Sequence, residues 1–334
     1  MSTPIYLTGI KPTGEPHLGN YLGAIKPAIE LVKNHASSIN YFFIADYHAL
    51  TTIKDPKVMK NYRYHVAATW LSFFENLDNC CFYFQSDVPQ IFELYWILSC
   101  FCPKGLLNRA HAYKSIVGKN IEANHDPDKN INHGLFSYPV LMAADILLFE
   151  ATHIPIGADQ KQHVEIAIEI VKGLNRFLSV KIPLPKPIIQ ENAELIIGID
   201  GQKMSKNYNN TLPIFADEKD LKKRIGKIST SSIPMGQPLD DKSCNVFKLS
   251  SYLMSINELS NLKSKYQSGA IGYGHAKAEL LATFQSYFHN QKQRFESFLS
   301  DPITLEHQLS KSSNALKEKA TQRLASIKKD LGFL

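Results

Sequence analysis

The segment Pro16-His17-Leu18-Gly19-Asn20 follows a short apolar strand, residues 4–8, and opens a helix. Glycine lets a ligand approach the backbone closely, and the free N–H groups at a helix start attract anions. A second segment far downstream, Gly201-Gln202-Lys203-Met204-Ser205-Lys206, is a polar loop with two lysines. Together the two segments are typical of an enzyme that holds a nucleotide triphosphate and neutralises its phosphates during reaction.

Strands and helices alternate outward from the first segment. The hydrophobic patterns predict helices over residues 18–34 and 56–74, and buried strands over residues 40–45 and 80–85. This order predicts an α/β fold, a Rossmann-like doubly wound parallel sheet covered on both faces. Ligands of such sheets bind beyond the carboxyl ends of the strands. The residues that follow the predicted strands are 9–14, 46–48 and 85–88.

The pattern changes after Ile199. From residue 217 onward the chain shows long helical periodicities, notably over residues 276–298 and 306–329, and no convincing strand. We therefore expect a Rossmann-like catalytic domain over residues 1–198. Residues 199–334 are expected to form the lysine loop and an all-α domain, whose last helix packs back on the catalytic domain.

Charge is spread unevenly along the 334 residues. Residues 1–200 hold 17 Lys and Arg against 19 Asp and Glu, whereas residues 201–334 hold 20 against 12. A basic domain joined to a near-neutral one suggests a polyanion partner such as nucleic acid. A solvated, lysine-rich helical surface explains the same excess equally well.

The sequence gives no sign of export or of metal binding. Met1-Ser2-Thr3-Pro4 runs straight into the first strand, and no window approaches eighteen uninterrupted apolar residues, so a cytoplasmic protein is expected. The five cysteines lack the spacing of a structural zinc site, which favours reduced thiols. No metal ligands are predicted.

One acid interrupts an otherwise apolar helix, predicted over residues 134–150. Asp145 lies within the run Met-Ala-Ala-Asp-Ile, residues 142–146. A carboxylate in such surroundings costs several kcal/mol of desolvation unless it is paired. Asp145 is therefore expected to have a specific partner, either a bound ligand or a nearby group of the protein.

These residues together resemble the class I aminoacyl-tRNA synthetases, most closely the tryptophanyl-tRNA synthetases. The matching stretches occur in the family's order over about two hundred residues, and the joint match is far more specific than any one piece. They are residues 9–24, 46–51, 138–147, 157–163 (Gly-Ala-Asp-Gln-Lys-Gln-His) and 203–206 (Lys-Met-Ser-Lys).

The resemblance implies an ATP-dependent ligase of protein biosynthesis. Tryptophan carboxylate attacks the α-phosphate of Mg-ATP to give tryptophanyl-adenylate and pyrophosphate, and the tryptophanyl group then passes to the 3′ end of tRNA(Trp). Mg²⁺ arrives on ATP, without dedicated protein ligands. Catalysis is then positioning plus charge stabilisation on the phosphates.

The resemblance also implies the nucleotide site. The residues expected to stabilise the reacting phosphates are Lys11, His17, Asn20, Lys203 and Lys206. The residues expected to bind ATP are Lys11, Pro12, Thr13, Gly19, Asn20, Gly157, Ala158, Asp159, Ile196, Lys203, Met204, Ser205, Lys206 and Asn207. Two positions depart from the family pattern: Ala158 stands where an acid is frequent, and Asn207 replaces the usual final serine.

Tryptophan selection is best assigned to Asp145, whose carboxylate can accept the indole N–H. A missing N–H would strand a buried charge, which rejects an analogue strongly. Tyr138, Gln160 and His48 are expected to hold the amino and carboxylate groups. Leu7, Gly9, Met142, Ile154 and Ile156 are expected to line the indole, although Met142 and the isoleucines are equally typical of core packing.

The C-terminal helices resemble the anticodon-binding part of the family. A basic cluster near the domain junction suits RNA phosphates; it comprises Lys219, Lys222, Lys223, Arg224 and Lys227. The resemblance implies a homodimer, with the apolar stretch 92–102 as candidate interface, and an interior helix is the other reading of that stretch. Two alternative functions stay open: a tyrosyl-tRNA synthetase, and a tRNA-binding paralogue that has lost catalysis.

Overall fold

The computed structural model describes residues 3–74, 78–189 and 196–334. A five-stranded sheet lies at the centre of this described part, and every neighbouring pair of strands is parallel. The strand order β3-β2-β1-β4-β5 confirms the predicted doubly wound sheet. The strands are β1 (Ile5–Ile10), β2 (Ile39–Ile44), β3 (Cys80–Phe84), β4 (His153–Ile156) and β5 (Lys186–Ile189).

The side chains of the strands pack alternately into two hydrophobic cores, one on each face of the sheet, because successive strand side chains point to opposite faces. Phe42 and Phe82 belong to the core beneath α2 (Lys26–Asn34), α4 (Pro56–Phe73) and most of the C-terminal helices. Tyr41 and Phe43 belong to the opposite core, beneath α5 (Gln90–Phe101), α8 (His133–Leu148) and α9 (Lys161–Leu174). Burial on both faces explains why β2 reads as a continuous apolar run.

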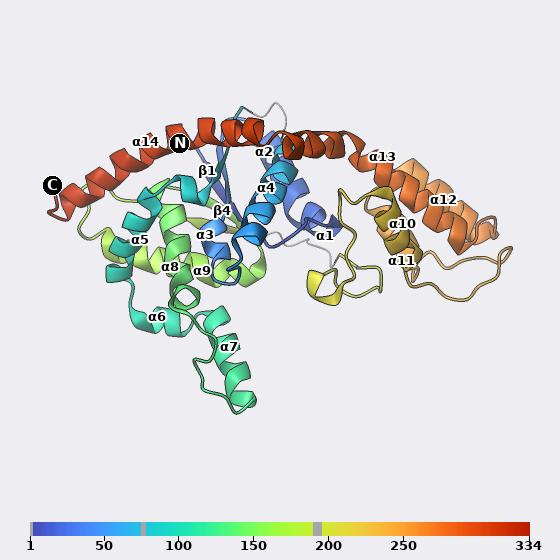
Figure 1. Cartoon of the computed structure of the whole chain (residues 1–334), viewed down its shortest axis with the longest axis horizontal. Coiled ribbons are helices and arrows are strands. Elements are labelled where there is room, and N and C mark those ends of the chain that lie inside the picture. Colours follow the sequence, from blue (N-terminus) through green and yellow to red (C-terminus); the bar gives the residue numbers. More distant parts are fainter. Residues whose placement is uncertain (1–2, 75–77, 190–195) are drawn as a thin grey trace.

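The helices of the first two hundred residues cover this sheet, except for two that project from the body (Figure 1). Asp55 caps α4 by accepting hydrogen bonds from the N–H groups of Lys57 and Val58 at 2.8 and 2.9 Å. These helices are α1 (Leu18–Asn20), α2 (Lys26–Asn34), α3 (Asp46–Ala49), α4 (Pro56–Phe73), α5 (Gln90–Phe101), α6 (Lys104–Asn108), α7 (His111–Glu122), α8 (His133–Leu148) and α9 (Lys161–Leu174). Short turns are the 3-10 segments η2 (Gln85–Asp87) and η3 (Ala158–Gln160).

The helix predicted over residues 18–34 is interrupted by one π-helical segment, η1 (Tyr21–Ile25). Tyr21 is buried there, and its hydroxyl lies 2.8 Å from that of Tyr287 on α13 (Tyr273–Ser300). Wide turns of this kind are frequent at functional sites. In this chain the segment directly follows the glycine-containing start of the helix.

The C-terminal region is helical, as predicted. Its helices are α10 (Glu218–Gly226), α11 (Asn245–Ser251), α12 (Ile256–Ser268), α13 (Tyr273–Ser300) and α14 (Pro302–Asp330), and a 3-10 turn, η4 (Lys206–Tyr208), precedes them. Helix α14 extends from this region along the sheet (Figure 1). Leu316, Leu324 and Ile327 of α14 share the core that contains Leu7 and Phe43.

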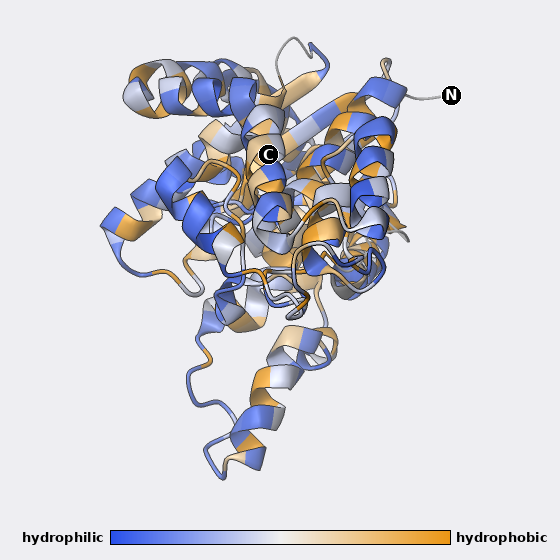
Figure 2. Ribbon diagram, turned by 90° about the vertical axis from the view of Figure 1, so that its right-hand side faces the viewer, coloured by the Kyte–Doolittle hydropathy of each residue, from blue (hydrophilic) through white to orange (hydrophobic). Residues whose placement is uncertain are grey.

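Two features were not predicted. The short fifth strand, β5, contains Pro187 and pairs with β4 at the edge of the sheet. The α6–α7 segment projects from the body, while hydrophobic residues concentrate around the central sheet (Figure 2).

Among the described residues, no helix combines the length and apolar character needed to cross a bilayer.

Candidate active site

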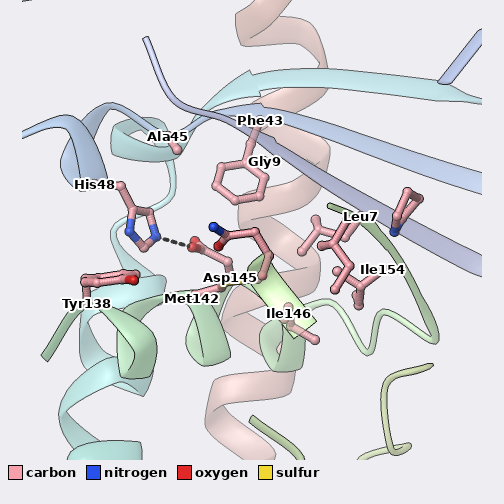
Figure 3. A pocket seen from close by; sticks show the side chains of 13 residues that line it. Leu7, Gly9, Phe43, Ala45, His48, Tyr138, Met142, Asp145, Ile146 and Ile154 are labelled. Carbon is pink, nitrogen blue, oxygen red and sulfur yellow. Dashed lines mark hydrogen bonds and ion pairs between the residues drawn. The ribbon is translucent and has the colours of Figure 1, made fainter. Parts of the chain in front are cut away.

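A cavity lies at the carboxyl ends of β1, β2 and β4. The chain leaves β1 toward β2 on one side and later returns to β4 on the other, so this is the point where crevices form in such sheets. Its lining residues are Leu7, Gly9, Phe43, Ala45, His48, Tyr138, Met142, Asp145, Ile146, Ile154, Pro155, Ile156 and Gln160 (Figure 3). All nine residues that the sequence analysis assigned to tryptophan are among them.

Among the described residues, Asp145 is the one carboxylate that lines this cavity, and its side chain is fully buried. His48 donates from Nε2 to Asp145 Oδ2 at 3.0 Å (Figure 3). Gln85 donates from Nε2 to both carboxylate oxygens, at 2.9 and 3.0 Å. Burial raises the pKa of the Asp145 carboxyl, and the hydrogen bonds from His48 and Gln85 oppose that rise.

A chain of polar side chains forms another wall of the cavity. The Tyr138 hydroxyl lies 2.7 Å from His163 Nε2, and His163 Nδ1 lies 2.8 Å from Gln160 Oε1. His163 is buried, so it holds Tyr138 and Gln160 at fixed positions relative to each other. These groups offer polar contacts to a ligand that also occupies the apolar part of the cavity.

Gly9 is required where β1 enters the cavity. Its neighbour in the register is Phe43 on β2. A Cβ atom at Gly9 would lie 2.6 Å from Cζ of Phe43, which is far inside van der Waals contact. The absence of a side chain therefore lets the Phe43 ring lie against the strand and form a flat apolar wall.

A second cavity lies between the start of the first helix and the lysine loop. Its volume is about 540 Å³, whereas the volume of the first cavity is about 180 Å³. The larger cavity suits a nucleotide, and the smaller one suits an amino-acid side chain. Its lining residues are Thr13, His17, Gly19, Asn20, Gly23, Ile196, Lys203, Met204, Ser205, Lys206 and Asn207. The end of β1 and the segment that follows it join the two cavities, because Gly9 lines one and Thr13 lines the other.

The lysine loop is docked on the helix start through backbone contacts. The N–H of Gly19 donates to the Met204 sulfur at 3.3 Å, and the N–H of Leu18 donates to the carbonyl of Leu212 at 2.8 Å. Asn210 is buried and holds the loop together: its Oδ1 accepts from the N–H of Ser205 at 2.8 Å, and its Nδ2 donates to the Lys203 carbonyl at 3.0 Å. This shape leaves the Lys203 side chain exposed.

His17 lies at the cap position before α1 and is buried. Its backbone N–H donates to Oδ1 of Asn20 at 3.1 Å. Burial, with the charge of Lys206 nearby, lowers the pKa of His17 from 6.5 to about 4. The imidazole is therefore neutral at physiological pH and faces the cavity as a hydrogen-bonding group rather than as a cation.

The predicted lysines occupy different positions. Lys206 donates to the Thr13 carbonyl at 3.2 Å, and loss of water around it lowers its pKa. Lys11 donates to Thr51 Oγ1 at 3.3 Å, and desolvation lowers its pKa as well. Lys11 is not among the residues that line the second cavity. Lys206 and Lys203 are therefore the cations that border it in the part of the chain that the structure describes.

Several other predicted nucleotide residues also lie outside that lining. Pro12 is buried and does not line the cavity, and Gly157 and Ala158 are exposed in the turn after β4. The side chain of Asp159 is outside the described part of the chain. The remaining nine predicted ATP contacts line the second cavity together with His17 and Gly23.

Sequence reasoning missed Gln85, His163 and part of the apolar lining. Phe43, Ala45, Ile146 and Pro155 line the first cavity without having been predicted there. The alternation of strand side chains was a usable signal for Phe43 and Ala45, since both face the same side of the sheet as Leu7. Gln85 was within the range expected after the third strand, but nothing in its local pattern indicated Asp145 as its partner.

The predicted basic cluster lies on and just after α10. Lys219, Lys222, Lys223 and Lys227 are exposed. Arg224 is instead held by Asp220 at 2.7 Å and by the Thr211 carbonyl at 3.3 Å. On α5, Ile91, Leu94 and Leu98 are buried, and Trp96 is 70% exposed, so the stretch 92–102 has both an interior and an outer face.

Comparisons with known proteins point to one family. The model of the family described as class I tRNA synthetases (W and Y) matches residues 2–289. The tryptophan–tRNA ligase of Pseudomonas aeruginosa is 42% identical over 336 residues, spanning 100% of this chain and 74% of that protein. The ligase of Campylobacter jejuni is 40% identical over 327 residues, spanning 98% and 99%. The Campylobacter jejuni tryptophanyl-tRNA synthetase complexed with ADP and tryptophan has a TM-score of 0.90 at 38% identity, over 98% of this chain and 99% of that one.

Proposed function

Because the chain belongs to the class I tRNA synthetases for tryptophan and tyrosine, we propose that it is a tryptophan–tRNA ligase. It activates L-tryptophan with ATP to tryptophanyl-adenylate and pyrophosphate, then transfers tryptophan to the 3′ end of tRNA(Trp). The observation that carries the choice of amino acid is Asp145, a fully buried carboxylate in the wall of a largely apolar cavity.

Tryptophan binds in the first cavity. The indole lies among Leu7, Gly9, Met142, Ile154 and Ile156, and its N–H donates to Asp145. Tyr138, Gln160 and His48 hold the amino and carboxylate groups at the polar side of the cavity. A phenylalanine ring would present no hydrogen-bond donor at the position of the indole nitrogen, so the buried carboxylate disfavours phenylalanine.

ATP binds in the second cavity. Gly19 lets the nucleotide approach the helix start, and Ile196 contacts the adenine. Two other segments complete the site: the backbone of Gly157, Ala158 and Asp159, and the β1–α1 segment with Lys11, Pro12 and Thr13. The loop with Met204, Ser205 and Asn207 then closes over the nucleotide. Mg²⁺ enters with ATP as part of the substrate. In the described ranges, no cluster of three or more His, Cys, Asp or Glu side chains is placed to hold a metal ion.

The chain contributes charge and positioning to the activation step. Lys203 and Lys206 border the cavity and neutralise charge that builds up on the phosphates, supported by Lys11. His17 and Asn20 lie one helical turn apart at the helix start and donate hydrogen bonds to the phosphates. No covalent intermediate with the protein is needed, because the tryptophan carboxylate is itself the nucleophile.

The tRNA and the second subunit bind elsewhere on the chain. The exposed lysines of α10 neutralise RNA phosphates. Trp96 is a large apolar side chain that is 70% exposed, which supports a homodimer interface on the outer face of α5. The boundary between the catalytic and helical domains lies at residues 198–199. The enzyme works in the cytoplasm, where its tRNA is used.

Exchange of radiolabelled pyrophosphate into ATP, measured with each of the twenty amino acids, tests this proposal. Tryptophan alone is expected to support rapid exchange, and purified tRNA(Trp) is then expected to accept it. Exchange with tyrosine alone would identify a tyrosine enzyme. Binding of tRNA without exchange for any amino acid would identify a paralogue that has lost catalysis.

A further inference from the structure

We propose that Gln85 is a positioning residue for amino-acid selection: it fixes the Asp145 carboxylate so that its one remaining acceptor position faces the indole N–H. This inference rests on the proposed function. Gln85 does not line the first cavity, so it acts through Asp145 rather than on the substrate.

The hydrogen bonds around Asp145 leave room for one more donor. An ionised carboxylate has about four lone-pair positions on its two oxygens. Gln85 Nε2 lies 2.9 Å from Oδ1 and 3.0 Å from Oδ2, and it occupies one position on each oxygen. His48 Nε2 occupies a third, at 3.0 Å from Oδ2. The fourth position belongs to a group that enters the cavity.

The residues on either side of Gln85 are held in place by contacts with Asp46 and Arg63. Gln85 follows β3 in the short turn η2, and the next residue, Ser86, donates from its backbone N–H to Asp46 Oδ1 at 3.1 Å and from its hydroxyl to Asp46 Oδ2 at 2.6 Å. Arg63 pairs with Asp46 at 2.8 Å and lies over the Phe84 ring, 4.1 Å from its centroid. These contacts fix the end of β3, and thereby the backbone from which the Gln85 side chain extends toward Asp145.

A neutral donor suits this position. A lysine or arginine would form a buried ion pair with Asp145 and would leave little negative charge to attract the indole N–H. An amide instead donates to the carboxylate and leaves its charge intact. Selection benefits from that charge, because an analogue without an N–H then leaves an ionised acceptor without its fourth partner.

The test compares tryptophan with 3-(3-benzothienyl)alanine, in which sulfur replaces the indole N–H in a ring system of similar shape. We take the ratio of the two kcat/KM values in pyrophosphate exchange as the measure of selection. Gln85→Met removes the donor at nearly constant size, and the ratio is expected to fall at least about tenfold, the value of a hydrogen bond to a charged group. The KM for ATP is expected to stay within about twofold.

Two further variants make the result decisive. Gln85→Asn keeps the amide but shortens the side chain by one methylene, so it is expected to lower the ratio as well. Gln90→Met is the matched control, because Gln90 bonds to Thr321 at 2.8 Å outside the cavity, and it is expected to keep the wild-type ratio.

Failure of this inference is distinguishable from failure of the proposed function. If wild type activates tryptophan but Gln85→Met and Gln85→Asn lower both substrates by the same factor, Gln85 has only a structural role and the inference is wrong. If wild type does not activate tryptophan, the proposed function is wrong instead.

Discussion

The backbone N–H of Gly19 donates a hydrogen bond to the sulfur of Met204 at 3.3 Å, across 185 residues of chain. A Cβ atom at residue 19 would lie 3.5 Å from the same sulfur and 3.1 Å from the ring of His17, so the helix start is closely surrounded. This contact joins the two segments that line the second cavity. The loop therefore carries its lysines to the helix start by docking its methionine there.

Lys203→Ala is expected to slow adenylate formation about a hundredfold while the Kd of ATP changes less than about threefold. In the proposed mechanism, the exposed Lys203 ammonium acts mainly when charge builds up on the phosphates. Single-turnover kinetics separate the two quantities. Lys242→Ala, in an exposed loop of the helical region, serves as the control. A large loss of ATP affinity at an unchanged rate would contradict this role of the loop.

Asp145→Ala is expected to raise the tryptophan KM roughly tenfold to a hundredfold and to leave the ATP KM within about twofold. The variant is also expected to be less stable by about 1–3 kcal/mol, because Gln85 and His48 lose their acceptor. Steady-state pyrophosphate exchange and thermal melting measure the two effects. Equal changes in both KM values would mean that the acid is purely structural.

His17→Asn is expected to make the protein less sensitive to acid. Folding lowers the pKa of His17 from 6.5 to about 4. Between these values the unfolded chain binds a proton that the folded chain does not, so wild-type stability is lost as the pH falls from 6.5 toward 4. Asparagine does not titrate. The decrease in Tm from pH 7 to pH 5 should be smaller in the variant, and identical decreases would show that His17 titrates normally.

Gly9→Ala is expected to weaken tryptophan binding, because the new methyl group meets the Phe43 ring at 2.6 Å and pushes it into the cavity. Overpacking of this kind costs about 1–3 kcal/mol of stability. Gly118→Ala on α7 is the control, since a Cβ there has nothing within 4 Å. Titration of intrinsic fluorescence with tryptophan and thermal melting compare the two variants. Unchanged affinity in Gly9→Ala would show that Phe43 is not a wall of the amino-acid site.

The parallel sheet was predictable because its first three strands are apolar runs separated by helical periodicities, so local pattern and fold agree. The fifth strand was not predictable in this way. Lys186-Pro187-Ile188-Ile189 is short, contains a proline and lies at the edge, and only pairing with β4 makes it a strand. The π-helical turn at Tyr21 likewise depends on packing, against Phe73 and Phe288, which lie far away in the sequence.

The first cavity was predictable only where its residues stand out in the local sequence. Asp145 stands out because it is an acid in an apolar helix. Its protein partners do not stand out, because His48 and Gln85 follow different strands and meet Asp145 only in the folded chain. The direction of Lys11 toward Thr51 is also a property of the packed side chains that no spacing in the sequence encodes.

The assignment of tryptophan selection to Asp145 is tested most directly by one distance, from the indole nitrogen to the nearer carboxylate oxygen of Asp145 in a crystal structure with tryptophan bound. A hydrogen bond is expected, at about 2.7–3.2 Å, with Gln85 and His48 still donating to the same carboxylate. An indole nitrogen that faces another group, with Asp145 bonded to Gln85 and His48 alone, would contradict the assignment of tryptophan selection to Asp145.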